Sequence, residues 1–384
     1  MSQVREHSSG VEKWLKLINA EGVGPVSFRK ILAHFGAVDG AFGASVAELK
    51  RIDGIGSKKA EAIIRTRNAF DAEGEVTLAS KLGVTILSLD DERYPPVLKR
   101  IYDPPPVLYV KGELARSDNL AVAIVGSRRC SIYGKEQASR FAHLLASAGF
   151  TITSGLAAGI DTAAHQGALA ASGRTIAVQG CGLANVYPPE NKGLFEMIAE
   201  SGAVVSELPL TYESLPENFP PRNRIIAGLS LGTIVIEAAN RSGALITARM
   251  ALENDREVMA MPGRVDSPLS KGCHELLRSG ATLVESINDV TEALGHFGQQ
   301  LKEHSSAVAE AVNHNVEAPL FDVSELNLSD NEREIYDCLG DEPIHLEEII
   351  AEADLSPGSI NAGLISLRLK GLIKQLPGSM FIRR

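Results

Sequence analysis

The feature that most constrains the fold is a regular alternation of short apolar runs and amphipathic segments between residues 120 and 295. The apolar runs predict strands at 120–125, 151–154, 175–179, 203–206, 232–236, 257–261 and 281–284. The segments between them predict helices at 133–148, 160–172, 190–201, 222–230, 242–254 and 270–279. Strands that alternate with helices in this way are typical of a parallel sheet covered on both faces. We therefore predict an α/β domain built on a parallel sheet over residues 118–295.

The loop after the first predicted strand has the composition of a phosphate-binding turn. The apolar run ends at Gly126, and Ser127 and Arg128 then lead into a long helical pattern from Tyr133. A helix that follows a parallel strand directs free backbone N–H groups to the strand end, and an arginine can bind a phosphate bidentately. One glycine does not match the three-glycine dinucleotide fingerprint. The alternative is an ordinary tight turn with solvated arginines.

Glycine, hydroxyl and arginine residues also follow other predicted strands. Ser154 and Gly155 open the run SGLAAGID, in which Asp161 is a candidate cap for the following helix. Arg222 and Arg224 come after the fourth strand. Ligands of such sheets bind outside the carboxyl ends of the strands. The pattern therefore predicts a wide, phosphate-sized rim along one edge of the sheet.

Composition restricts how the chain can bind a polyanion. Its 384 residues are 44% hydrophobic, enough for two or three domains, and its net charge of −10 argues against coating nucleic acid by bulk attraction. Within residues 118–295, 11 of 14 basic residues are arginine, which favours discrete phosphate contacts. No apolar stretch could span a membrane, and four separated cysteines suggest neither zinc nor disulfides. We expect a cytoplasmic protein without membrane contact, metal or cofactor.

The N-terminal part of the chain reads as short helices followed by a connector. Residues 1–83 contain two similar glycine turns, Glu21–Pro25 and Ile52–Gly56, which resemble a helix-hairpin-helix. Glycines in that motif let backbone amides approach a DNA phosphate. The alternative is a small helical module that only packs on its neighbour. Residues 84–117 form a proline-rich connector with one strand-like run, and we expect them to brace the module against the sheet domain.

The C-terminal part consists of a polar linker, residues 296–328, and a small module, residues 329–384. Helices predicted at Glu332–Gly340, Leu346–Ala353 and Pro357–Lys370, followed by a possible hairpin, resemble a winged helix. The third helix would be the recognition helix. The module carries six basic and ten acidic residues, so its net charge is −4. We therefore favour a protein-contact or regulatory role for it over DNA reading.

Several motifs in order along the chain resemble the DNA-processing protein A (DprA/Smf) family. They are Gly126-Ser127-Arg128 with Ser131 and Tyr133-Gly134, SGLAAGID at 154–161, FPPRNRIIAGLS at 219–230, SGALITA at 242–248 and Met261-Pro262-Gly263. The resemblance implies a SAM-like or helix-hairpin-helix module, an extended Rossmann-like domain and a winged helix. It also implies a homodimer that binds and protects single-stranded DNA during natural transformation in competent cells, and that loads the RecA recombinase.

The resemblance also assigns residues. The phosphate-binding arginine of the family corresponds to Arg128, and its basic RNR run corresponds to residues 222–224. Together with the strand-end pattern, this predicts DNA binding by Gly126, Ser127, Arg128, Ser131, Tyr133, Ser154, Gly155, Arg222, Asn223 and Arg224. One departure is Gly272-Cys273-His274, where the family pattern has Gly-Thr-Asn.

Other side chains have two interpretations each. Tyr133, Tyr187 and Phe219 would either stack on bases or pack within the fold. The apolar residues of 276–283, namely Leu276, Leu277 and Leu283, would serve either a dimer or the recombinase.

An enzyme is the alternative function. Gly232-Thr233 with Glu237 resembles part of the signature of the LOG-type nucleotide phosphoribohydrolases, in which a glutamate and an arginine serve cleavage of an N-glycosidic bond. The Pro-Gly-Gly expected before it is absent, so we interpret Glu237 as a helix cap or an arginine partner. His165 has no second ligand at helical spacing, and we interpret it as a packed or surface residue. We therefore predict no catalytic residues and a binding protein rather than an enzyme.

Overall fold

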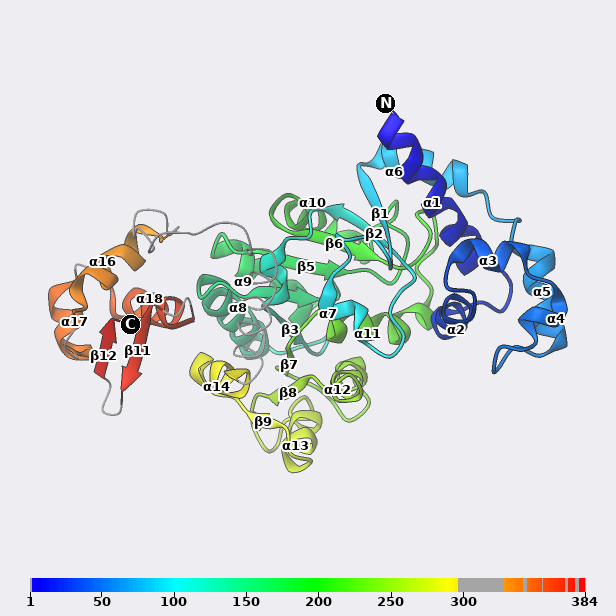
Figure 1. The fold of residues 1–384 in the computed structure, drawn as a ribbon. Helices are drawn as coiled ribbons and strands as arrows, with labels where there is room; N and C mark the ends of the chain where they lie inside the picture. The colour runs from blue at the N-terminus through cyan, green and yellow to red at the C-terminus, as the bar shows by residue number, and fades with distance from the viewer. Residues whose placement is uncertain are drawn as a thin grey trace.

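The computed structural model describes residues 2–295, 328–340, 344–353, 355–369, 372–376 and 380–383. The predicted linker lies outside these ranges except for residue 328, as does Lys370. An N-terminal helical module, a central sheet and a C-terminal module follow one another along the chain (Figure 1). No helix among the described residues is long and apolar enough to cross a membrane.

All seven predicted strands of the central domain are present. They are β3 (Ala121–Val125), β4 (Thr151–Ser154), β5 (Thr175–Val178), β6 (Ala203–Ser206), β7 (Gly232–Val235), β8 (Glu257–Ala260) and β9 (Thr282–Leu283). Neighbouring strands among them pair in parallel, in the order β6-β5-β4-β3-β7-β8-β9. The chain therefore builds outward from β3 to β6 and returns to place β7 on the other side of β3. This reversal of direction between β3 and β7 is a topological switch point, where ligands bind in open α/β sheets.

The connector contributes two more strands to this sheet. Strand β1 (Val84–Ser88) pairs antiparallel with β2 (Val107–Gly112), and β2 pairs antiparallel with β6. The sheet is thus mostly parallel with an antiparallel edge. Sequence indicated only the first of these strands. The residues of β2 directly follow a proline-rich turn, but Val107 to Val110 are buried in the sheet.

Helices cover both faces of the sheet, as the alternation of predicted strands and helices requires. The main helices are α8 (Ile132–Ser147), α9 (Ile160–Ala170), α10 (Lys192–Ser201), α11 (Phe219–Gly228), α12 (Gly243–Glu253), α13 (Lys271–Arg278) and α14 (Ile287–Ala293). Val122 and Ile124 pack in one core cluster with α8 and α9, whereas Ala123 and Val125 belong to the cluster of α11 and α12. Alternate side chains of β3 therefore bind the two helix layers to one strand.

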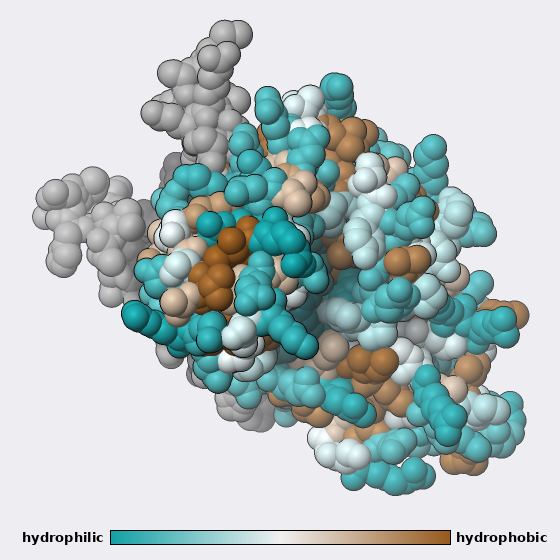
Figure 2. Space-filling view, turned by 90° about the vertical axis from the view of Figure 1, so that its right-hand side faces the viewer, coloured by the Kyte–Doolittle hydropathy of each residue, from teal (hydrophilic) through white to brown (hydrophobic). Residues whose placement is uncertain are grey.

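The N-terminal module consists of α1 (Ser2–Ile18), α2 (Pro25–Phe35), α3 (Val38–Gly43), α4 (Val46–Leu49), α5 (Ser57–Thr66) and α6 (Ala72–Leu82). Its two glycine turns adopt similar backbones, with φ of 83° at Gly22 and 80° at Gly54. The Lys59 ammonium donates to Ser27 Oγ at 2.6 Å, which joins α5 to α2. The face of the molecule that carries this module is mostly hydrophilic, with small separate hydrophobic patches (Figure 2).

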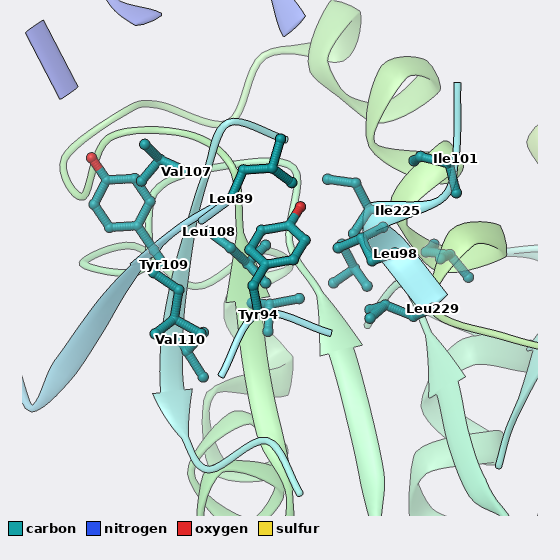
Figure 3. Packing of buried hydrophobic residues seen from close by; sticks show 14 of the residues in the cluster. Leu89, Tyr94, Leu98, Ile101, Val107, Leu108, Tyr109, Val110, Ile225 and Leu229 are labelled. Atoms are coloured by element: carbon teal, nitrogen blue, oxygen red, sulfur yellow. The ribbon is translucent and has the colours of Figure 1, made fainter. Parts of the chain in front are cut away.

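The connector packs the N-terminal module onto the sheet domain. Short helix α7 (Pro96–Lys99) and its flanking turns place Tyr94 and Leu98 beside Ile225 of α11 and Leu229, the residue after that helix (Figure 3). The Tyr94 hydroxyl donates to the Pro105 carbonyl at 2.9 Å, so this buried ring keeps a polar partner. The hydrophobic cluster is therefore continuous from the module through the connector to the central sheet.

The C-terminal module is a winged helix. Helices α16 (Asp330–Cys338), α17 (Leu346–Glu352) and α18 (Pro357–Leu369) pack with strands β10 (Ile344–His345), β11 (Ile373–Leu376) and β12 (Met380–Arg383). The strands form a separate antiparallel sheet in the order β10-β12-β11. Buried residues Ile335, Ile349 and Leu367 form its own core.

The close contact between α8 and α9 generates a stability prediction. A Cβ built on Gly167 would overlap the backbone carbonyl of Ser139, so Gly167→Ala must separate the two helices. Overpacking of this kind costs roughly 1–3 kcal/mol. We expect calorimetry to show a lower unfolding temperature for Gly167→Ala. The matched control is Gly193→Ala in α10, where a Cβ meets nothing within 4 Å. An equal or higher unfolding temperature for Gly167→Ala would contradict the packing.

Candidate functional site

The loop after β3 lies at the topological switch point and is held by its backbone. The Ser127 N–H donates to the Glu237 carbonyl at 2.8 Å, and the Ile160 N–H donates to the Ser127 carbonyl at 3.3 Å. A Cβ on Gly126 would overlap Ile160, so only glycine permits this approach of strand and helix. The loop is thereby fixed between β7 and α9, while the side chain of Arg128 is exposed.

The start of α8 is organised by Glu237. Ser131 is the N-cap residue, and its hydroxyl accepts from the Gly134 N–H at 2.9 Å. The Ser131 N–H and hydroxyl donate to the two carboxylate oxygens of Glu237 at 2.8 and 2.6 Å. Glu237 is not itself a cap residue; it supports the cap of α8 by binding Ser131, and both its oxygens already accept hydrogen bonds. Tyr133 in the first turn of α8 is 51% exposed.

The glycine loop after β4 is held by two buried side chains. The Asp161 carboxylate accepts from the Gly155 N–H at 3.1 Å, and the Asn191 amide donates to the Leu156 carbonyl at 2.8 Å. The expectation that Asp161 caps α9 is wrong, because the N-cap position is Gly159 and carries no side-chain bond. Asp161 lies inside the first turn, and its carboxylate turns back onto the loop instead.

A buried arginine lies beneath this loop. Arg222 Nη1 donates to the Gly155 carbonyl at 2.8 Å and also to the Val178 carbonyl, while its Nε has no partner among the described residues. Burial lowers the pKa of Arg222 to about 10, Asp161 opposes that shift, and Arg128 adds to it. Burial raises the pKa of Asp161 against the opposing effect of Arg222. The guanidinium therefore remains charged at neutral pH.

Aromatic and cationic groups meet above the buried arginine. The guanidinium carbons of Arg128 and Arg222 lie 5.0 and 5.8 Å from the ring centroid of Phe219. The Tyr187 ring lies 5.3 Å from Phe219 and is tilted by 41°. We call Arg128, Tyr187, Phe219 and Arg222 the Phe219 cluster. Arg128 and Arg222 carry two positive charges against the one buried carboxylate of Asp161, so the local charge at this edge of the sheet is positive. The partly exposed rings of Tyr187 and Phe219 offer flat apolar surface.

Besides Ser131 and Arg222, three more of the predicted site residues have their polar groups engaged inside the fold. The buried Ser154 hydroxyl donates to a β3 carbonyl at 2.6 Å, and the Asn223 amide lies 3.4 Å from a carbonyl at the start of α12. Buried Arg224 donates to Asp103 at 3.0 Å and to both oxygens of Glu207 at 2.8 and 2.6 Å. Their assignment as DNA contacts stays a prediction. Through these bonds, Arg224 links the connector to the residue that follows β6.

The histidines singled out in the sequence have structural partners. His165 is fully buried, with Nδ1 2.7 Å from the Thr175 hydroxyl, so its interpretation as a packed residue is confirmed. His274 Nε2 lies 3.0 Å from the Gly263 carbonyl. His274, at one of the positions that differ from the family pattern, therefore joins α13 to the loop after β8. No group of three or more His, Cys, Asp or Glu residues that could hold a metal occurs in the described ranges.

Three protein-family models match this chain, and together they cover the sequence motifs described above. Residues 85–295 match the family model of DNA recombination-mediator protein A. Residues 321–379 match the DprA winged helix domain, and residues 15–68 match a SAM-like helix-hairpin-helix tandem.

Relatives and solved structures of the same family are similar over most of the chain. Protein Smf of Synechocystis is 36% identical over 97% of this chain and 98% of its own length. The X-ray structure of DNA processing protein A from Streptococcus pneumoniae has a TM-score of 0.64 at 37% identity, covering 73% of this chain and 96% of that one. A structure of the Helicobacter pylori protein, described as binding single-stranded DNA, has a TM-score of 0.50 at 31% identity, covering 55% and 95%.

The ion pairs of Arg224 predict a structural phenotype. Arg224→Ala leaves the carboxylates of Asp103 and Glu207 without their cation, and breaking a buried pair in this way costs about 3–5 kcal/mol. Arg128→Ala, which removes an exposed charge, should change stability by less than about 0.5 kcal/mol. Calorimetry of both variants measures the difference. Equal unfolding temperatures would mean that the buried pairs contribute nothing to the fold.

Burial of His165 predicts a pH dependence of stability. Burial lowers the pKa of His165 to about 3, whereas the unfolded chain takes up the proton near pH 6.5. Stability from the neutral ring is therefore complete above pH 6.5 and falls as the pH drops toward 3. Between pH 8 and pH 5 we expect a loss of about 2 kcal/mol in the free energy of unfolding that His165→Gln lacks. Parallel denaturant titrations test this, and identical pH profiles would contradict it.

Proposed function

Because this chain belongs to the DprA/Smf family of DNA-processing proteins, we propose that it binds single-stranded DNA through the Phe219 cluster. The observation that carries the proposal is the meeting of two guanidinium groups and two aromatic rings at the carboxyl ends of β3, β4 and β5, beside the topological switch point. The Helicobacter pylori relative, described as binding single-stranded DNA, supports the same ligand class.

Each member of the cluster has a distinct role in this proposal. Arg128 is exposed on a fixed loop and binds a phosphate with its guanidinium. Phe219 and Tyr187 stack on bases, which is sequence-tolerant because every base has a flat aromatic face. Arg222 is buried, so it acts through its charge and through the position it gives the Gly155 loop. Binding is therefore expected to depend weakly on sequence and strongly on salt.

The remaining predicted contacts surround this cluster. Gly126 and Ser127 hold the Arg128 loop, Ser131 begins α8 beside it, and Tyr133 presents a half-exposed ring from the first turn of α8. We propose that the strand follows this rim, with Tyr133 as a third stacking candidate. We assign no direct phosphate contact to Ser154, Asn223 and Arg224, because their polar groups are engaged inside the fold.

We further propose that the chain acts with a recombinase and forms a homodimer. The matched family is described as a recombination mediator, which supports loading of the RecA recombinase onto DNA that this chain protects in the cytoplasm. A homodimer is supported by Leu283, which is 47% exposed on β9, the last strand of the central sheet. Leu276 and Leu277 are half-buried against the core and offer less surface.

We propose a binding protein rather than a phosphoribohydrolase. A hydrolase of the LOG type needs a glutamate that is free to reach its substrate. Both carboxylate oxygens of Glu237 accept hydrogen bonds from Ser131. A Cβ on Gly134 would overlap the same carboxylate, so the helix start is packed directly against it. The surroundings of Glu237 thus favour a structural role.

The direct test is fluorescence anisotropy of labelled single strands at several salt concentrations. Arg128→Ala should weaken binding of all sequences by about 10- to 100-fold, as loss of a charged hydrogen bond predicts. It should also reduce the slope of log affinity against log salt by roughly 0.7 for the lost phosphate contact. The control is Arg249→Ala, which removes another exposed arginine, in the middle of α12.

Phe219→Leu is a second variant in the same assay. It keeps an apolar side chain but removes stacking, worth roughly 1–3 kcal/mol per base, and should leave the salt slope unchanged. Wild-type affinity in both Arg128→Ala and Phe219→Leu would contradict the proposed site. A loss in Arg128→Ala that depended on base identity would make that residue a base reader.

A further inference from the structure

One face of the third winged-helix helix, α18, points away from the core of its own module. Its opposite face supplies Ile360, Leu364 and Leu367, which are buried in that core. The outward stripe follows helical spacing and consists of Gly358, Asn361, Ala362, Ile365 and Arg368. A helix that enters a DNA groove presents polar and basic side chains to base edges and phosphates. This stripe is mostly small or apolar, with one basic residue.

The α18 stripe lies against two helices of the central domain. Its members line a shared cavity with Arg140 and Leu144 from α8 and with residues 286–288 at the start of α14. Ile365 packs against the core cluster that α8 contributes to. Arg368 Nη2 lies 3.3 Å from the Thr291 hydroxyl of α14, to which it donates. Helix α18 lies on the side of the module that faces α8 (Figure 1).

We propose that the surface formed by α8 and α14 is a docking site for the chain's own winged-helix module, and that α18 is a protein-contact helix. Small residues allow the close approach, Ile365 supplies apolar contact, and Arg368 supplies one polar bond. The module's net charge of −4 also disfavours a polyanion as the partner of this helix. Docking covers the helix that a winged helix would use to read DNA.

The docking site is separate from the Phe219 cluster. Leu144 lies in the last turn of α8, thirteen residues from Ser131 at its start, which corresponds to about 20 Å along the helix. Release of the module therefore leaves Arg128 and Phe219 as they are. The inference does not rest on single-strand binding, and the two can fail independently.

Two stripe variants test the docking in the full chain. Ile365→Asp places a carboxylate in the cavity that Leu144 also lines, and Ala362→Arg places a long side chain in the same cavity. Neither residue is fully buried, so we expect the module to remain folded. The control is Ala351→Asp on exposed α17. Small-angle scattering should give a larger radius of gyration for both stripe variants and no change for the control.

Hydrogen exchange supplies a second readout that follows the surface directly. Amides at the end of α8 and in α14 should exchange at least about 5-fold faster in both stripe variants, while those of α16 keep their rates. Unchanged scattering and exchange in both variants would overturn the proposal. So would a wild-type dimer that Ile365→Asp converts to a monomer, because the module would then dock on a second copy. Gain of duplex DNA binding in the stripe variants would overturn the protein-contact role of α18.

Discussion

The candidate site depends on the buried guanidinium of Arg222. Its bonds to the carbonyls of Gly155 and Val178 join the loops that follow β4 and β5, and Asp161 supplies the opposite charge. An unpaired buried charge would cost several kcal/mol, so the sequence must provide these partners together. With Arg222 fixed in this way, Phe219 at the start of α11 lies above it. The position of α11 thereby sets the position of the proposed stacking surface.

Much of the fold follows from local pattern, because strand and helix periods are properties of short segments. Every predicted strand of residues 120–284 occurs within one or two residues of its expected limits. Helix α11 begins at Phe219, earlier than predicted, because Pro220 and Pro221 fit a first helical turn. Strand β2 was not anticipated, since its identity as a strand depends on pairing with β1 and β6, far away in sequence.

Side-chain roles were harder to predict than elements. Arg128 and Arg222 are 94 positions apart, and only the sheet order brings both to the Phe219 ring. The family motif made Arg222 and Arg224 look equivalent, yet the partners of Arg224 come from the connector and from the end of β6. Pattern reveals which residues end a strand, whereas burial and long-range partners decide which of them face a ligand.

The proposed function requires that single-stranded DNA contacts the Phe219 cluster. The most direct measurement is photo-cross-linking of the full chain to a single strand carrying 5-iodouracil, followed by peptide mapping. We expect cross-links at Phe219 or Tyr187 that disappear with excess unlabelled single strand. Cross-links confined to the N-terminal module or to the winged helix, with none at these two rings, would contradict it.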